Sequence, residues 1–372
     1  MSENVRLSHS SATMFADCSM KWKYWYKDKL RPKTQSAALL FGTAVDRGVG
    51  AILQPDEKQT AESIFGYFWR FQEVNGKKTY LPTCKDIVYS NTDYDAELLH
   101  QEDIDKLKEE YKIEDPIMEI YQLYQYKDKV GFDHLPDEQK VLLNHANWLS
   151  LYRKGLLMLD AVKTEIMPNV EEVLGVQEFV KLENQDGDSV IGYVDFVCRW
   201  KGYNKPVVFD FKTSSIEYNK DSVVISPQLS LYVNALHEKY DTRYAGYLVL
   251  NKNVRKNKTK VCKVCSFKNE GTNHKTCNNM VDGQRCNSEW DIKIDPKIWV
   301  QIIVDEINEV VENNVIDNMD WINKSIKSGL FHRNMSSCIK YNGKVKCAFY
   351  DKCYKGTDEG LQKPEDKINE SQ

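Results

Sequence analysis

The spacing of hydrophobic residues changes along this chain from a helical period to the alternation that is typical of strands. Apolar residues recur at helical spacing in several segments, and serines precede two of them as caps. Helices are therefore expected over residues 8–27, 39–53, 144–162, 226–240 and 296–315. Strand-like runs bounded by turn residues predict strands over residues 173–183, 189–200, 206–212, 244–251 and 289–295. This order predicts an α/β (α+β) protein, with a mostly antiparallel sheet flanked by helices.

Composition bounds the class of protein. The 372 residues are 41% hydrophobic and 28% charged, as in a soluble globular protein of one large domain or two ordinary ones. No apolar run approaches the roughly 20 residues that span a bilayer, and no signal-peptide core begins the chain, so we expect an intracellular protein without a membrane partner. The net charge of −4 gives no global argument for nucleic acid. Residues 85–115 hold eleven acidic and four basic residues, which indicates an accessory, solvated segment.

Two opposite charges interrupt the most apolar of the predicted strands. Asp210 and Lys212 are two residues apart, so they share one face of the strand, while Phe209 and Phe211 share the other. On its own, such a pair is most simply a structural ion pair at a strand end. The neighbouring strands must decide between this reading and a functional one.

Further carboxylates fall on those neighbouring strands. Asp195 and Glu178 interrupt the two preceding apolar strands, and short hairpins would bring both toward Asp210 and Lys212. Crowded carboxylates repel unless a cation neutralises them, and oxygen ligands favour Mg²⁺ or Mn²⁺. A nearby lysine could then orient a metal-activated water for attack on phosphorus.

The helix after this strand adds two polar side chains. Gln228 and Tyr232 are four residues apart, so they lie on one helical face, near the end of the strand that carries Asp210.

Together these residues resemble the PD-(D/E)xK nuclease superfamily, in its RecB-like exonuclease branch. The resemblance rests on GYVD ending at Asp195, FDFKT around Asp210 and Lys212, PQLSLY ending at Tyr232, and the N-terminal LSHSSATMFADCSMKWKYWY. It implies a restriction-endonuclease-like core with a mixed central sheet. It also implies a Mg²⁺- or Mn²⁺-dependent DNA exonuclease or DNA-end-processing nuclease that acts in recombination, repair or replication.

The resemblance also assigns roles. Asp195 and Asp210 would bind the metal, Lys212 would be the catalytic lysine, and Glu178 would support the metal site. Gln228 and Tyr232 would form the wall of the active site and hold the DNA strand. Asp46 stands where the family usually has histidine, and it can still ligate a hard cation.

Partners and location follow from the same resemblance. DNA, as single strands or duplex ends, would be the substrate. The chain has no phosphate-binding loop of the GxxxxGK[ST] type, so a helicase or recombination motor would be a separate protein. The cytoplasm of a bacterial or phage-infected cell is the expected location.

Four of the ten cysteines form a compact set. Cys262, Cys265, Cys277 and Cys286 begin with a C-x-x-C pair, which is the layout of a zinc ribbon with a closed tetrahedral site. His274 could replace one of the cysteines, and a redox pair or unrelated thiols are the alternatives. Residues 251–290 hold nine Lys or Arg against three Asp or Glu, so this module could also grip a phosphate backbone.

Four other cysteines are divided between the two ends of the chain. Cys18 lies in the first predicted helix, and Cys338, Cys347 and Cys353 lie more than 300 residues later. This set resembles the iron–sulfur staple of RecB-like nucleases, which implies a 4Fe-4S cluster bound by four thiolates. The interval from Cys338 to Cys347 is longer than the corresponding interval is in most RecB-like nucleases. Zinc at the same site, or no metal, is the alternative.

These expectations divide the chain into five regions. We expect N-terminal helices of the nuclease domain over residues 1–60, a helical accessory insertion over 61–165, the nuclease core over 166–250, the zinc module over 251–290, and a C-terminal helix and cysteine tail over 291–372. The alternative function is a non-catalytic nucleic-acid-binding protein that uses the zinc module on an inactive nuclease scaffold. An oxidoreductase that uses the cysteines would need a glycine-rich dinucleotide loop, which the sequence lacks.

Overall fold

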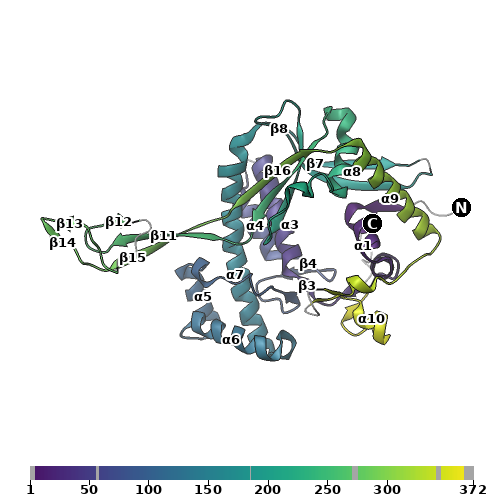
Figure 1. Ribbon diagram of the computed structural model, residues 1–372. Helices are drawn as coiled ribbons and strands as arrows, with labels where there is room; N and C mark the ends of the chain where they lie inside the picture. Colours follow the sequence, from purple (N-terminus) through teal and green to yellow (C-terminus); the bar gives the residue numbers. More distant parts are fainter. Residues whose placement is uncertain (1–4, 56–57, 185, 270–274, 341–344, 364–372) are drawn as a thin grey trace.

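A mixed six-stranded sheet forms the centre of the protein (Figure 1). The computed structural model describes residues 5–55, 58–184, 186–269, 275–340 and 345–363. The sheet contains β1 (Arg6–Ser8), β7 (Val170–Glu183), β8 (Ser189–Trp200), β9 (Val207–Ser214), β10 (Tyr244–Asn251) and β16 (Val300–Glu306). The order is β1-β8-β9-β10-β16, and β7 also pairs with β8. Strands β1 and β8 are parallel, as are β9 and β10, and the other pairs are antiparallel. The expected fold class is confirmed at the level of a mixed α/β architecture.

Helices cover both faces of this sheet because its strands alternate between two cores. Phe209 of β9 packs with α3 (Ala37–Leu53), α4 (Ala61–Arg70) and α7 (Asp137–Ala161). Its neighbour Val208 packs with α8 (Pro227–Tyr240) on the opposite face. Helix α8 begins as predicted, since the Ser226 side chain accepts a hydrogen bond from the Leu229 backbone N–H at 3.1 Å.

The region predicted to be an accessory insertion shares the main core. Helices α5 (Gln101–Tyr111) and α6 (Pro116–Val130) pack on α7, and Leu107 and Ile120 belong to the same hydrophobic cluster as Phe209. Residues 61–165 therefore contribute helices to the body of the protein as well as the acidic surface that the sequence indicated.

The helix predicted over residues 296–315 is wrong in its first half. This segment forms β16, which pairs antiparallel with β10 from Tyr244 to Leu250, and α9 (Glu309–Lys327) follows with Asn308 as its N-cap. The first half is rich in Val and Ile, which suit a sheet edge beside β10 as well as a helix face, and strand pairing decides between the two.

The helix predicted over residues 8–27 is interrupted at Cys18. It divides into α1 (His9–Asp17), α2 (Ser19–Trp22) and a π-helical turn (Lys23–Lys27), and Cys18 between them is extended, with φ −162° and ψ 107°. The break turns the cysteine out of the helical repeat.

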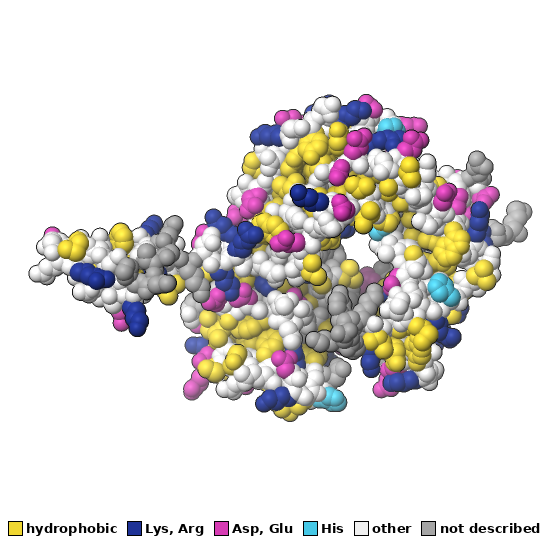
Figure 2. Space-filling view, in the orientation of Figure 1, with side chains coloured by type: hydrophobic (Ala, Val, Ile, Leu, Met, Phe, Trp, Pro, Cys, Tyr) yellow, Lys and Arg dark blue, Asp and Glu magenta, His cyan; other side chains and the backbone are white. Residues whose placement is uncertain are grey.

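A two-stranded arm projects from the body (Figures 1 and 2). Strands β11 (Arg255–Cys262) and β15 (Trp290–Lys297) form the ribbon. Its tip carries β12 (Lys268–Asn269), β13 (Met280–Val281) and β14 (Gln284–Arg285). The predicted zinc module is thus the tip of a longer arm that includes the strand expected over residues 289–295.

Short elements close the rest of the molecule. They are β2 (Arg31–Pro32), β3 (Gln35–Ser36), β4 (Phe71–Val74), β5 (Lys77–Tyr80), β6 (Ile87–Val88), β17 (Ile339–Lys340), β18 (Val345–Lys346), α10 (Tyr350–Lys355) and β19 (Leu361–Gln362). Strand β19 pairs with β2, so the C-terminal segment lies against the N-terminal one. Across the described parts of the chain, the helices lack the combination of length and apolar character that crossing a membrane requires.

Candidate active site and cysteine clusters

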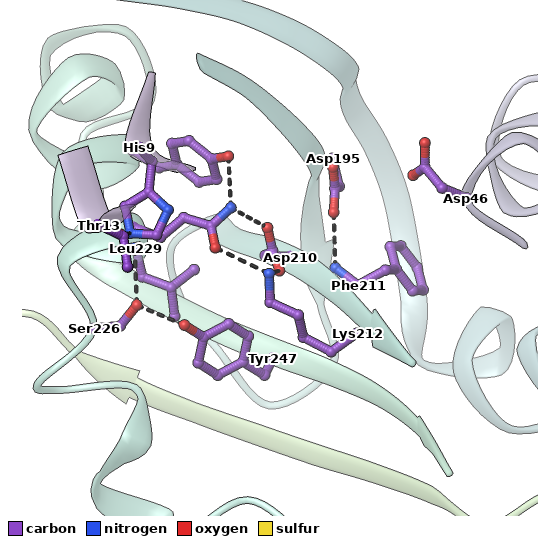
Figure 3. A network of polar contacts seen from close by, with 12 residues as sticks. His9, Thr13, Asp46, Asp195, Asp210, Phe211, Lys212, Ser226, Leu229 and Tyr247 are labelled. Atoms are coloured by element: carbon purple, nitrogen blue, oxygen red, sulfur yellow. Dashed lines mark hydrogen bonds and ion pairs between the residues drawn. The ribbon is translucent and has the colours of Figure 1, made fainter. Parts of the chain in front are cut away.

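Asp210 and Lys212 project from β9 toward α8 and form the centre of a polar network (Figure 3). Asp210 is only 2% exposed, and its Oδ2 lies 2.6 Å from Lys212 Nζ. Gln228 of α8 joins both residues, since its Oε1 accepts from Lys212 Nζ at 2.9 Å and its Nε2 donates to Asp210 Oδ1 at 2.7 Å. One side chain therefore fixes the lysine and the carboxylate relative to each other.

Tyr232 lies one turn beyond Gln228, on the helical face that the sequence predicted. The buried Tyr232 hydroxyl accepts a hydrogen bond from Gln228 Nε2 at 2.8 Å. Burial raises the pKa of Tyr232, and the Asp210 carboxylate adds to this effect, so the hydroxyl stays protonated at neutral pH.

Asp195 is turned toward β9 by an irregularity in β8. Val194 and Val197 both pack on the α8 side, whereas Phe196 packs on the α3 side, so the strict alternation fails at Asp195. The ladder between β8 and β9 runs only from Cys198 to Phe196, which leaves the Phe211 N–H to donate to Asp195 Oδ2 at 2.9 Å. The Asp195 side chain therefore takes the place of a strand partner at this backbone N–H.

Gln177 is a site residue that sequence reasoning missed. Its backbone has a φ of 50°, a left-handed conformation inside β7, and its Nε2 donates to Asp195 Oδ1 at 3.3 Å and to Asp46 Oδ1 at 3.2 Å. Gln177 thereby links a strand carboxylate to Asp46 of helix α3. A polar residue within the apolar run VQEFV was the available signal, and it was assigned to the neighbouring Glu178 instead.

Glu178 does not join these carboxylates, so its predicted place is corrected. Glu178 pairs with Val194 of β8, which faces α8, and its side chain therefore points toward the C-terminal end of that helix. There it forms an ion pair with Lys239 and accepts a hydrogen bond from the Tyr240 hydroxyl at 2.7 Å. This arrangement is that of a structural residue.

The three aspartates oppose one another electrostatically. Burial, followed by repulsion from Asp210 and Asp46, raises the pKa of Asp195 well above its ordinary value. Burial also raises the pKa of Asp46, and that of Asp210 despite the attraction of Lys212. Asp210 Oδ2 is buried, and its close contact is the ion pair with Lys212 Nζ. Three carboxylates whose pKa values are raised in this way fit the oxygen ligands of a hard divalent cation.

The aspartates are less tightly grouped than a preformed metal cage. Their oxygens do not all lie within 4.8 Å of one another, since among the described residues only the compact cysteine set meets that spacing. Gln177 holds Asp46 and Asp195 apart through its amide.

His9, which the sequence did not single out, lies in the first turn of α1 at the edge of the polar network (Figure 3). Its Nε2 lies 3.2 Å from Thr13 Oγ1. Burial, with a contribution from the Lys212 charge, lowers the pKa of His9 to about 4, so the imidazole is neutral beside the lysine.

The compact cysteine set has the geometry of a tetrahedral metal site. The Sγ atoms of Cys262 and Cys286 are 3.6 Å apart, as are those of Cys265 and Cys277, and all four lie within 4.8 Å of one another. Zn–S bonds of 2.3 Å give tetrahedral edges of about 3.8 Å, so four thiolates at this spacing could bind an ion such as zinc. His274, the alternative ligand, lies outside the described residues.

Backbone donors prepare one of these thiols for metal binding. Burial alone would raise the pKa of Cys262, but the N–H groups of Cys265 and Val264 donate to its Sγ at 3.3 and 3.4 Å and lower it to about 6. The neighbouring thiols contribute to raising the pKa of Cys277 to about 12, after burial. A cation is the simplest means of holding all four as thiolates.

The four cysteines from the chain ends lie in one part of the molecule: Cys18, Cys338 and Cys347 affect one another electrostatically, and Cys353 packs in the same hydrophobic cluster as Cys347. The Cys18 Sγ accepts from the Asn334 N–H at 3.5 Å, and the Cys347 N–H donates to the Cys338 carbonyl at 2.8 Å. Burial raises the pKa of Cys347, and the thiols of Cys338 and Cys18 add to the shift. Cys353 contacts the Tyr24 hydroxyl at 3.9 Å in the same lobe. A cluster with one thiolate per iron needs wider spacing than a single ion does.

A cleft of about 310 Å³ opens beside the carboxylates. Asp46 and Lys212 line it, together with Leu39, Thr43 and Phe211. The cleft therefore reaches Asp46 and Lys212 of the candidate site, while Asp195 and Asp210 are not among its described lining residues.

Comparisons with known proteins supply no family for this chain. No protein-family model matches it, and no curated protein matches it. Among solved structures, the crystal structure of SSO0001 is similar over 60% of this chain and 84% of that chain, with 11% identity and a TM-score of 0.24. A likeness this weak carries no argument about fold or function.

Proposed function

We propose that the protein is a Mg²⁺- or Mn²⁺-dependent DNA exonuclease or DNA-end-processing nuclease. The observation that carries this proposal is the network in which Gln228 holds Lys212 against the buried Asp210 while Asp195 crowds the same strand end. A purely structural ion pair needs neither the second carboxylate nor the open cleft beside it.

Each residue has a defined part in this chemistry. Asp195 and Asp210 would hold the cation, with Asp46 joining once Gln177 releases it. A bound divalent cation supplies charge stabilisation at phosphorus and a more acidic water. Lys212, fixed by Gln228, orients the attacking water and offsets negative charge that develops on the phosphate. Tyr232 keeps Gln228 in place from behind.

The cysteine sets are proposed to be structural. Zinc fits the arm tip, where four thiols gather within 4.8 Å and form a closed site. A 4Fe-4S cluster is proposed for Cys18, Cys338, Cys347 and Cys353, because the fold brings these distant residues into one lobe. The cluster would fasten the C-terminal segment to the N-terminal helices.

The arm is proposed to contact DNA through its tip and not through the lysines at its base. Lys256 is already paired with Asp95 and Glu97 of the body, at 2.7 and 2.6 Å. The exposed cations Lys268 and Arg285 of the tip make no ion pair with a described residue. The protein would act in recombination, repair or replication, in the cytoplasm, and a separate helicase would supply any motor.

A digestion time course tests the proposal. End-labelled single- and double-stranded DNA should be degraded with Mg²⁺ or Mn²⁺, and cleavage should disappear in EDTA and in Asp195→Asn. If the purified, folded protein binds DNA but leaves it intact with either metal, the non-catalytic nucleic-acid-binding alternative replaces the nuclease.

A further inference from the structure

A second cleft continues from the one at the carboxylates. It measures about 520 Å³, and Leu39 lines both clefts, so they adjoin near the start of helix α3. Leu39 is 62% exposed, and it lies seven residues before Asp46, a rise of about 10 Å along the helix. Any ligand longer than the catalytic pocket would therefore be led toward the second cleft.

The far wall of this second cleft carries a stacked aromatic and cationic pair. The Arg31 guanidinium lies 4.1 Å from the centre of the Trp25 ring, and both side chains line the cleft. Arg31 Nη1 donates to the backbone carbonyls of Trp25 and Leu30. These two bonds lock the guanidinium in place over the indole.

The remaining donors of Arg31 are unused. Its Nε and Nη2 make no hydrogen bond, and the guanidinium makes no ion pair, with any described residue. Glu73 is the one carboxylate among the described lining residues. A fixed, half-buried guanidinium without a carboxylate partner is suited to a phosphate or to the edge of a base.

We propose that Trp25 and Arg31 form a stacking subsite for single-stranded nucleic acid, reached along α3 from the catalytic carboxylates. The inference rests on the proposed nuclease function and adds a site that holds the strand away from the scissile bond. Aromatic rings and arginine planes bind unpaired bases without reading sequence. Paired bases present no free face, so the subsite selects single strands over duplex.

Substrate length provides the test. Fluorescently labelled oligothymidylates from a dinucleotide to about 16 nucleotides are titrated with the protein in Ca²⁺, to measure affinity without cleavage. Affinity should rise with length and then level off. Trp25→Ala should weaken binding of the longest strand about tenfold and leave the dinucleotide unchanged, whereas Trp25→Phe should retain most of the affinity.

A surface variant protects the test against misfolding. Leu39→Glu places a negative charge where the two clefts adjoin, so it should weaken binding of all strands and most strongly that of the long ones. Leu330→Glu is its matched control, because Leu330 is 66% exposed and lines neither cleft. The control should bind single-stranded DNA and single-stranded RNA with the same affinity as the wild type does.

The outcomes separate this inference from the proposed nuclease. Length-dependent binding that Leu39→Glu removes, in a protein that never cleaves, would support the subsite and overturn the nuclease. The subsite would be overturned, and the nuclease left standing, if the protein cleaves DNA but its affinity does not depend on strand length. The same holds if the affinities of Leu39→Glu and Trp25→Ala both equal that of the wild type. Equal binding of blunt duplex and single strands, equally weakened by Leu39→Glu, would also contradict the single-strand assignment.

Discussion

The aspartate site and the arm tip differ in how their side chains are held in place. At the aspartate site, a six-stranded sheet and the helices on both its faces hold buried like charges close together. At the arm tip, strands of two residues, β12, β13 and β14, surround four thiols with almost no apolar core. The packed body thus positions the aspartates, whereas the arm tip would depend on a metal bound by its four thiols for its own folding.

The difference follows from where the folding free energy arises. The body buries large side chains such as Phe209 and Trp69 completely, whereas Val264, Met280 and Ile292 of the arm are 75%, 61% and 55% exposed. Small units that bury so little apolar surface depend on a metal or a crosslink. Metal removal should therefore affect the two regions differently.

Disrupting the proposed metal site at the arm tip is the change with the largest expected effect. Cys265→Ser, or a strong chelator, should unfold the arm tip, since a structural zinc contributes on the order of 10 kcal/mol to small domains. Hydrogen exchange measured by mass spectrometry should show the tip unprotected while α8 and β9 stay protected. A tip that stays protected without metal would break the comparison.

Replacing the central lysine should abolish catalysis and leave both regions folded. Lys212→Ala should lower the rate of DNA cleavage by about 10² to 10³ or more, because it removes preorganised charge at the phosphate. Lys239→Ala is the matched control, since Lys239 pairs with Glu178 away from the site. Equal rates for Lys212→Ala and the control would remove Lys212 from the mechanism.

Relieving the repulsion between the aspartates should stabilise the metal-free body. Asp195→Asn removes a buried charge whose pKa is raised by burial and by its neighbours. The free energy of unfolding in EDTA at neutral pH should rise on the order of 1 kcal/mol. Calorimetry should show the gain disappear when Mn²⁺ saturates the wild type, and a loss of stability in EDTA would mean that the carboxylate is structurally required.

The contact between arm and body should contribute least. Lys256→Ala removes the ion pairs to Asp95 and Glu97, which are partly exposed. The free energy of unfolding of the body should therefore fall by less than about 1 kcal/mol. Exchange should quicken only at the base of β11. DNA affinity that falls sharply in this variant would instead return Lys256 to the DNA-binding surface.

The sequence was sufficient where a local signal marks both the type and the ends of an element. It predicted β8 and β10 and the start of α8, because apolar runs of strand length between turn residues, and a serine cap, leave little choice. It failed at β16, whose Val- and Ile-rich segment suits a strand or a helix until β10 is present to pair with it.

Within the site, the same limit applies. Asp210, Lys212, Gln228 and Tyr232 meet because simple strand and helix geometry places them together. The sequence predicted Glu178 at the site, but Gln177 lies there instead. The cause is the left-handed backbone of Gln177 in β7, which no hydrophobic pattern encodes.

Direct measurement of manganese binding tests the central claim, that the aspartates hold a hard cation independently of the cysteines. Free Mn²⁺ is followed by electron paramagnetic resonance as zinc-loaded protein is added. The wild type and Cys265→Ser should bind Mn²⁺ with equal affinity. Asp210→Asn should bind Mn²⁺ at least tenfold more weakly. Manganese binding that survives Asp210→Asn and disappears with Cys265→Ser would contradict the account.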